Sequence, residues 1–184
     1  AAPETRAYRI RSALTKAGDE WRFTKMVGNY GASDISGWLT VAIIDPRPKL
    51  TGEFLTRSLA MVDFAPFLGY DAQTVATKGA QAAVPQTGGT PRLLPDAPLN
   101  VEALRHFDAA IKYEVRDIKG QNIPISNASL TLSLDDRLLK LAPFNFDMAR
   151  GHVDSDIIIN ARDLRVVTDY DIRLSPTPMN RLLA

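Results

Sequence analysis

The sequence contains no cysteine. Disulfides, thiolate metal sites and cysteine nucleophiles are therefore excluded, although the compartment is not fixed, because many proteins of oxidising compartments also lack disulfides. The sequence also lacks an excess of charge of one sign, since 22 Lys and Arg residues face 21 Asp and Glu residues. Because no block of like charge could follow a phosphate backbone, we expect no nucleic-acid partner.

Long apolar runs are missing as well. No stretch approaches the roughly 18 to 20 consecutive apolar residues of a membrane-spanning helix, and the N-terminus has no signal-peptide pattern. The segment from Arg6 to Leu14 already has the pattern of a strand. We therefore expect a soluble piece of a longer protein, with any membrane anchor outside this sequence.

Residue combinations typical of catalysis or metal binding are scarce. His106 and His152 have no cluster of Asp or Glu at ligand spacing, so no metal is expected. Asp135 and Asp136 are adjacent, and adjacent strand residues point to opposite faces, which favours a hairpin turn over an acid and base pair. Ser33 lacks the Gly-x-Ser-x-Gly elbow of a nucleophile. We predict a non-enzymatic protein without a cofactor.

The dominant pattern is an alternation of apolar and polar residues, which is typical of β-strands. Its clearest example runs from Ile35 to Ile43, and the proline-rich Asp45 to Pro48 must end that strand. We therefore predict a mainly β fold. The predicted strands cover residues 6–14, 21–27, 35–43, 50–59, 111–115, 130–134, 139–148, 153–161 and 167–174.

This pattern of strands and turns occurs twice. It predicts two repeated β units, residues 1–69 and 100–184, that extend one sheet edge to edge. Between them, residues 70–99 are rich in Ala, Gln, Thr, Gly and Pro, which favours a flexible connector. We expect antiparallel strands in a curved, trough-like or sandwich-like sheet. Short helices are expected at about residues 62–69, 100–107 and 177–183.

Several stretches of the chain match short sequence motifs. Gly28 to Leu39 contains the pattern G-x-S-D-x-x-G-x-L, and Pro48 to Gly52 is similar to R-P-x-L-x-G. Asp63 to Gly69 resembles D-L-A-P-L-x-G, and Arg92 to Leu99 resembles L-L-P-D-x-P-L. Leu130 to Phe144 is similar to L-x-L-x-L-x-D-G-x-L-x-L-x-P-L. These motifs span almost the whole chain, and their order and spacing resemble those of bacterial AsmA-like proteins.

The resemblance implies the C-terminal periplasmic part of an inner-membrane-anchored protein in a bacterium with two membranes. Members of this family are linked to the integrity of the cell envelope and, in larger relatives, to phospholipid transport between membranes. The chain departs from the family pattern at Arg137, where Gly is usual, and in the turn Met148 to Gly151. Both departures concern turn geometry. On this basis we expect a role in the envelope and in outer-membrane biogenesis.

A lipid trough needs a continuous apolar surface, because exposing an acyl chain of about sixteen carbons at ~0.8 kcal/mol per CH2 costs on the order of a dozen kcal/mol. We therefore predict that the apolar faces of the strands form a groove for phospholipid acyl chains. The candidate groove residues are Leu39, Val41, Ile43, Phe54, Leu130, Leu132, Leu134, Phe144, Phe146, Ile157, Ile159, Ile172 and Leu174.

Two alternatives remain open. The same apolar residues could face a closed core, which would give a structural or protein-interaction β-sandwich of the envelope without lipid binding. A carbohydrate-binding or hydrolytic β-domain would need an exposed aromatic platform with paired carboxylates, and only Trp21 and Trp38 are available for one. The sequence does not predict an oligomeric state.

Overall fold

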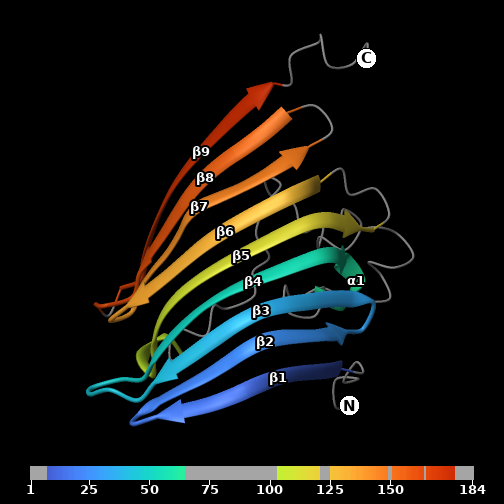
Figure 1. Cartoon of the computed structure of the whole chain (residues 1–184). Coiled ribbons are helices and arrows are strands. Elements are labelled where there is room, and N and C mark those ends of the chain that lie inside the picture. Colours follow the sequence, from blue (N-terminus) through green and yellow to red (C-terminus); the bar gives the residue numbers. More distant parts are fainter. Residues whose placement is uncertain (1–7, 65–102, 121–124, 149–150, 164, 177–184) are drawn as a thin grey trace, which may run out of the picture.

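A single nine-stranded sheet makes up most of the computed structural model, and its strands lie side by side in chain order (Figure 1). The structure describes residues 8–64, 103–120, 125–148, 151–163 and 165–176. The strands are β1 (Tyr8–Ala17), β2 (Glu20–Tyr30), β3 (Ser33–Ala42), β4 (Lys49–Ala60), β5 (Asp108–Lys119), β6 (Ile125–Asp135), β7 (Leu138–Met148), β8 (Gly151–Asn160) and β9 (Val167–Pro176). The predicted mainly β fold is confirmed.

One pair of neighbours departs from the predicted antiparallel arrangement. β4 and β5 are parallel, with Lys49 opposite Asp108 and Ala60 opposite Lys119. All other neighbouring strands among the described residues are antiparallel. A parallel pair requires a connection long enough to return the chain to the end of the sheet where the first strand began. The predicted connector, residues 70–99, belongs to this connection and lies outside the described residues.

The structure describes parts of two of the predicted helices. α1 (Met61–Phe64) occupies the start of the helix predicted at 62–69, and the one-turn 3-10 helix η3 (Ala103–Arg105) lies within the region predicted at 100–107. The remainder of both regions, apart from residues 106 and 107, and the helix predicted at 177–183 lie outside the described residues. In the part of the chain that the structure describes, no helix has the length and apolar character needed to cross a membrane.

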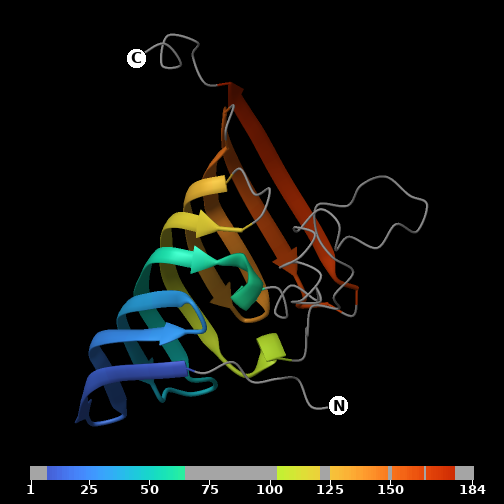
Figure 2. The same cartoon turned by 90° about the vertical axis from the view of Figure 1, so that its right-hand side faces the viewer.

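The sheet is strongly curved, and α1 and η3 lie on its concave side (Figure 2). The strand register sorts the side chains onto two faces, because directly opposed residues of neighbouring strands point to the same side. One line of cross-strand partners, called the central row here, crosses every strand of the sheet. It consists of Leu14, Phe23, Leu39, Gly52, Ile111, Leu132, Leu141, Ile157 and Tyr170.

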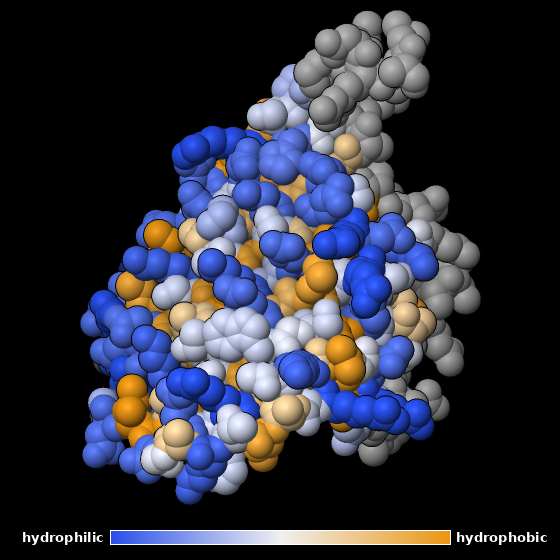
Figure 3. Space-filling model, in the orientation of Figure 1, coloured by the Kyte–Doolittle hydropathy of each residue, from blue (hydrophilic) through white to orange (hydrophobic). Residues whose placement is uncertain are grey.

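The central row belongs to the concave face. Leu104 of η3 packs in one buried cluster with Ala109, Leu134 and Leu139, and Leu132 and Leu141 of the central row pack against that cluster. The opposite, convex face is predominantly hydrophilic, as Figure 3 shows. Apolar rows therefore line the inside of the curve, and polar side chains cover most of the outside.

The two predicted repeat units lie edge to edge in this sheet. β4 of the first unit pairs with β5, and β5 pairs with β6 of the second unit. Within the described residues no second sheet faces the first, so the predicted alternative of a sandwich is wrong for this part of the chain. The apolar strand residues of the two halves extend one surface and do not bury one another face to face.

Candidate functional site: the concave face

The predicted groove residues come together on the concave face. Leu39, Leu132 and Ile157 lie in the central row itself. The other residues lie in the neighbouring rows, and only Ile43 falls beyond the end of its strand. The row toward α1 contains Phe54, Leu130, Phe144 and Ile172, the row toward η3 contains Val41, Leu134 and Ile159, and Phe146 and Leu174 both oppose Val153.

Exposure differs greatly along this face. Leu134 is 3% exposed and belongs to the cluster closed by Leu104, so it forms part of the core. Ile172 is 44% exposed and Leu174 is 72% exposed, so the face becomes open toward β9. The other candidates on the strands are half-buried. Leu14, the β1 member of the central row, is 52% exposed as well, so the face is closed next to η3 and accessible at both its β1 and β9 sides.

Sequence reasoning missed several residues of the same surface. Phe23, Ile111 and Leu141 belong to the central row, and Tyr170 ends it on β9 with 72% exposure. On β1, Ile10 opposes Gly28, which opposes Ile35, so these residues also share the concave face. The period-two alternation of each strand was the signal that could have identified them.

A polar pair interrupts the apolar surface near α1. Thr56 Oγ1 and the Tyr113 hydroxyl lie 2.9 Å apart, and Thr56 is 1% exposed. Burial raises the pKa of Tyr113, while the hydrogen bond with Thr56 opposes that shift. The phenol therefore stays neutral and can both donate and accept a hydrogen bond. The hydrogen bond thus gives both hydroxyl groups a partner on an otherwise apolar surface.

The α1 end of the sheet, where β3 begins and β4 ends, is fixed by a buried carboxylate. Asp63 of α1 is 0% exposed, and its Oδ2 accepts hydrogen bonds from the Ala32 backbone N–H and the Ser33 hydroxyl, each at 2.8 Å. The Ser33 Oγ in turn accepts from the Ala60 backbone N–H at 2.9 Å. Two of the AsmA-like motifs, one around Ser33 and one beginning at Asp63, therefore contact each other.

Asp34, the residue after Ser33, also accepts hydrogen bonds at the α1 end. Its carboxylate accepts hydrogen bonds from the backbone N–H groups of Ser58 at 2.7 Å and Arg57 at 3.2 Å. Burial acts to raise the pKa of Asp34, but these two N–H groups and the Arg57 charge lower it, and the net shift is downward. The side chain thus satisfies backbone donors of β4 beyond Leu55, where its pairing with β3 ends. The Ser-Asp motif is structural here.

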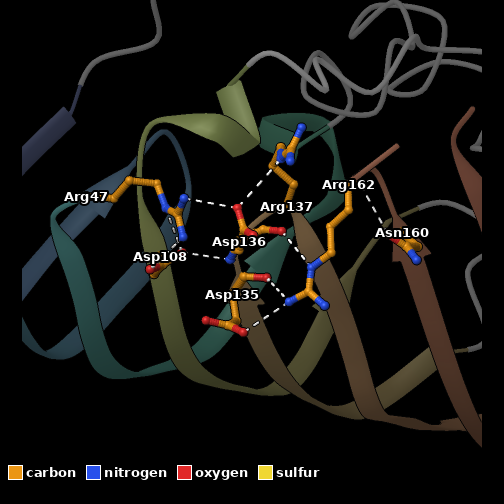
Figure 4. Close-up of polar contacts among 7 residues, drawn as sticks. All are labelled: Arg47, Asp108, Asp135, Asp136, Arg137, Asn160 and Arg162. Carbon is orange, nitrogen blue, oxygen red and sulfur yellow. Dashed lines mark hydrogen bonds and ion pairs between the residues drawn. The ribbon is translucent and has the colours of Figure 1, made fainter. Parts of the chain in front are cut away.

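The opposite end, called the Arg47 end here, is fixed by charged side chains (Figure 4). The Arg47 Nε lies 3.2 Å from Asp108 Oδ1, and its Nη1 lies 3.0 Å from Asp136 Oδ1. Asp108 Oδ1 also accepts the Asp136 backbone N–H at 3.0 Å. Burial acts to raise the pKa of Asp108, but the Asp136 N–H and the Arg47 guanidinium together hold it below its ordinary value. This network joins the two halves of the chain.

The turn between β6 and β7 belongs to the same network. Asp136 has a φ of +43° and Arg137 a φ of +63°, so both adopt the left-handed conformation that a tight hairpin turn requires. Arg162 supports the turn because its guanidinium donates to the Asp136 carbonyl at 3.0 Å and to the Asp135 carbonyl at 3.1 Å. The predicted hairpin turn is confirmed, and Arg137 occupies a position where glycine would carry less strain.

A polar cluster lies on the convex face near the start of β8. His152 Nδ1 lies 2.6 Å from Asp147 Oδ1, and His152 Nε2 lies 3.3 Å from Asp154 Oδ1. The hydrogen bond with Asp147 raises the pKa of His152, and the same bond lowers the pKa of Asp147. Among the described residues no group of three or more His, Asp or Glu side chains is arranged to hold a metal ion.

Comparison with known proteins gives one family. The model of the AsmA family matches residues 11–184. The AsmA family protein YhjG of Escherichia coli (strain K12) is 31% identical over 138 residues, which cover 71% of this chain and 20% of that protein. The chain therefore spans about a fifth of the length of the curated relative that it matches. No solved structure matches the chain.

Proposed function

The chain belongs to the AsmA family, and this membership supports an association with the cell envelope. We propose that its concave face binds phospholipid acyl chains in the periplasm. In this proposal the longer protein is tethered to the inner membrane, and the segment acts without catalysis. Its contribution is to hold or pass phospholipid between membranes and so to maintain the envelope. The observation that carries the proposal is the central row of the sheet.

The central row offers the continuity that an acyl chain needs. It crosses nine strands, and at about 4.8 Å per strand its eight intervals span roughly 38 Å. Apart from Gly52 and the exposed Tyr170 at its end, every member is aliphatic or phenylalanine. Neighbouring rows add Phe54, Leu130 and Phe144. Such a surface offsets the cost of exposing an acyl chain better than separate pockets would.

The direction of entry follows from the gradient of exposure. The η3 side is filled by the Leu104 cluster, whereas Ile172 and Leu174 of β9 are exposed. Ile10 and Leu14 of β1 are exposed to a similar degree, at 49% and 52%, so we place lipid along the rows away from η3, with entry from the β1 or the β9 side of the concave face. Leu134, which is 3% exposed, would support the surface from beneath without contacting lipid in this arrangement.

Adjacent isoleucines on β8 give a matched test. Ile157 lies in the central row, whereas Ile158 opposes Lys140 and Asp169 on the convex face, and both are half-buried. A photo-crosslinking residue at Ile157 or Leu132, introduced into the longer protein in living cells, should capture phospholipid that mass spectrometry identifies. The same residue at Ile158 is the control. Capture at neither concave position, or equal capture at Ile158, would overturn the proposal.

A further inference from the structure

A cleft of about 340 Å³ lies over strands β1 to β4, and its lining is rich in arginine. Arg9 and Arg11 reach it from β1, and Arg57 reaches it from β4. Asp34 of β3 is the only acidic residue among the described residues that line it. Three arginines and one aspartate give the lining a net charge of +2. A cleft lined mainly by charge of one sign raises the local concentration of ions of the opposite sign, here anions.

The strand register places the charged side chains of this cleft on the convex face, which Figure 3 shows. Arg9 opposes Asn29, which opposes Asp34. The Asp34 carboxylate accepts the Arg57 backbone N–H at 3.2 Å, so Arg57 lies beside it on β4. Ile10, the neighbour of Arg9, lies on the concave face, so this row lies on the other side of the sheet. Because strand side chains stand roughly perpendicular to the sheet, the cleft does not depend on what lies beside the outer edge of β1.

Asp34 leaves most of the positive charge of the cleft uncompensated. Its carboxylate accepts two backbone N–H groups of β4, and its Oδ2 lies 4.0 Å from the Arg57 Nε. The Arg57 side chain is still 73% exposed, so its guanidinium can bind a further anion. Within the described part of the chain, Arg9 and Arg11 form no ion pair or hydrogen bond. These two like charges lie roughly 7 Å apart on one face of β1, and an anion between them would relieve their repulsion.

The lining suits a phosphate group better than a carboxylate. The N–H donors of a guanidinium match the oxygens of a phosphate in pairs. A phosphate monoester carries a charge of about −1.5 to −2 at neutral pH and has three acceptor oxygens, so arginines on different sides can bind it together. A carboxylate offers one charge and two oxygens. Asn29, which is exposed in the cleft, adds neutral amide donors.

We propose that this convex cleft binds a phosphate group, held between Arg9 and Arg11 on one side and Arg57 on the other. The same chemistry is offered by a free phosphate or phosphate ester and by the headgroup of phosphatidic acid at a membrane surface. The site lies on the face of the sheet opposite the apolar rows. It therefore does not depend on the binding of acyl chains to the concave face.

Titration of the 184-residue chain with inorganic phosphate at constant ionic strength tests the site. In NMR spectra, the side-chain Nε–H signals of Arg9, Arg11 and Arg57 should shift together and reach saturation. The variant Arg9→Gln/Arg11→Gln should weaken the affinity by at least about tenfold, because it removes two charged donors. Arg22→Gln is the matched control, since Arg22 lies on the convex face of β2 outside the cleft and pairs with Glu20. This control should change the affinity by less than about twofold.

Vesicle sedimentation distinguishes the two sources of phosphate. Retention on phosphatidylcholine vesicles that requires added phosphatidic acid, and that Arg9→Gln/Arg11→Gln abolishes, would identify the lipid headgroup. Saturable binding of inorganic phosphate without such retention would identify a free phosphate or phosphate ester. Neither saturable binding nor arginine-dependent retention, or equal weakening by Arg22→Gln, would overturn the inference. The lipid proposal is tested separately by capture at Ile157, which Arg9→Gln/Arg11→Gln should leave unchanged.

Discussion

The two ends of the strands are held together by different chemistry. At the α1 end, the fully buried Asp63 carboxylate accepts hydrogen bonds from neutral donors of the turn between β2 and β3. At the Arg47 end, a guanidinium and two carboxylates form ion pairs, and these side chains are 21% to 46% exposed. A buried polar group is costly to leave unpaired, whereas partly exposed ion pairs are weakened by solvent and salt.

Because of this difference, the stability of the two ends should be sensitive to different changes. The α1 end should respond most to changes of backbone shape that displace the Asp63 carboxylate. The Arg47 end should respond to pH and to ionic strength, because its contacts are made by groups that titrate or are screened. Substitutions at each end, paired with controls, can test this contrast.

The largest effect is expected at the α1 end, for Gly31→Ala. Gly31 has a φ of +60°, and an added Cβ would lie 2.1 Å from Asp63 Oδ1. Left-handed strain and displacement of the buried carboxylate together should lower the free energy of unfolding by about 3–4 kcal/mol. Gly18→Ala is the control at the Arg47 end, because Gly18 has a φ of +57° but nothing within 4 Å of the added atom. Equal losses in denaturant unfolding would contradict the proposed role of Asp63.

Core packing beside the Arg47 end should give the next largest effect. Leu134→Ala removes a side chain that is 3% exposed and leaves a cavity next to Leu104, so a loss of about 2–3 kcal/mol is expected. Leu174→Ala changes a side chain that is 72% exposed and should cost under about 0.5 kcal/mol. Denaturant midpoints of the two variants give the comparison. Similar costs would show that the concave face is closed on the β9 side as well.

Asp108→Asn tests the ion-pair network itself. Because the folded-state pKa of Asp108 is held below its ordinary value of 3.8, its stabilising contribution is present above that pH and is lost as the pH falls through the folded-state value. We expect a loss of about 1–2 kcal/mol near neutral pH, and this difference from the unmodified chain should shrink in acid. Asp135→Asn, at a side chain that is 76% exposed, is the control. A difference between Asp108→Asn and the unmodified chain that persists in strong acid would refute the assignment.

The smallest effect is expected for His152→Gln on the convex face. Asp147 raises the pKa of His152 above its ordinary value of 6.5, so the stabilisation by the protonated ring is complete below that pH and is lost as the pH rises through the folded-state pKa. Melting temperatures measured between about pH 5 and pH 9 should show the unmodified chain losing its advantage over the variant as the pH rises. His106→Gln, at an exposed position, serves as the control. A constant difference would exclude the titration of His152 as its source.

Much of the fold could be predicted because strand alternation is a local property. Leu39, Leu132 and Ile157 each lie at the alternate positions that carry the apolar residues of their strand. Turn residues such as Asp136 mark where the chain reverses direction between strands. Whether a residue has an odd or even position along its strand determines which face its side chain lies on once the strands pair. The family was also predicted from motifs, and the match to the AsmA family confirms it. The lipid role of the concave face stays a prediction.

The sequence by itself thus determined that the chain forms strands, where they turn, and which side chains of each strand face the same way. Only the tertiary structure decided that β4 and β5 run in parallel, because the direction of a strand after a long connection is not encoded in its alternation. It also decided that Leu134 is buried while Leu174 is exposed, although both are leucines on one face. That difference arises from what packs on the sheet, which is a long-range property of the fold.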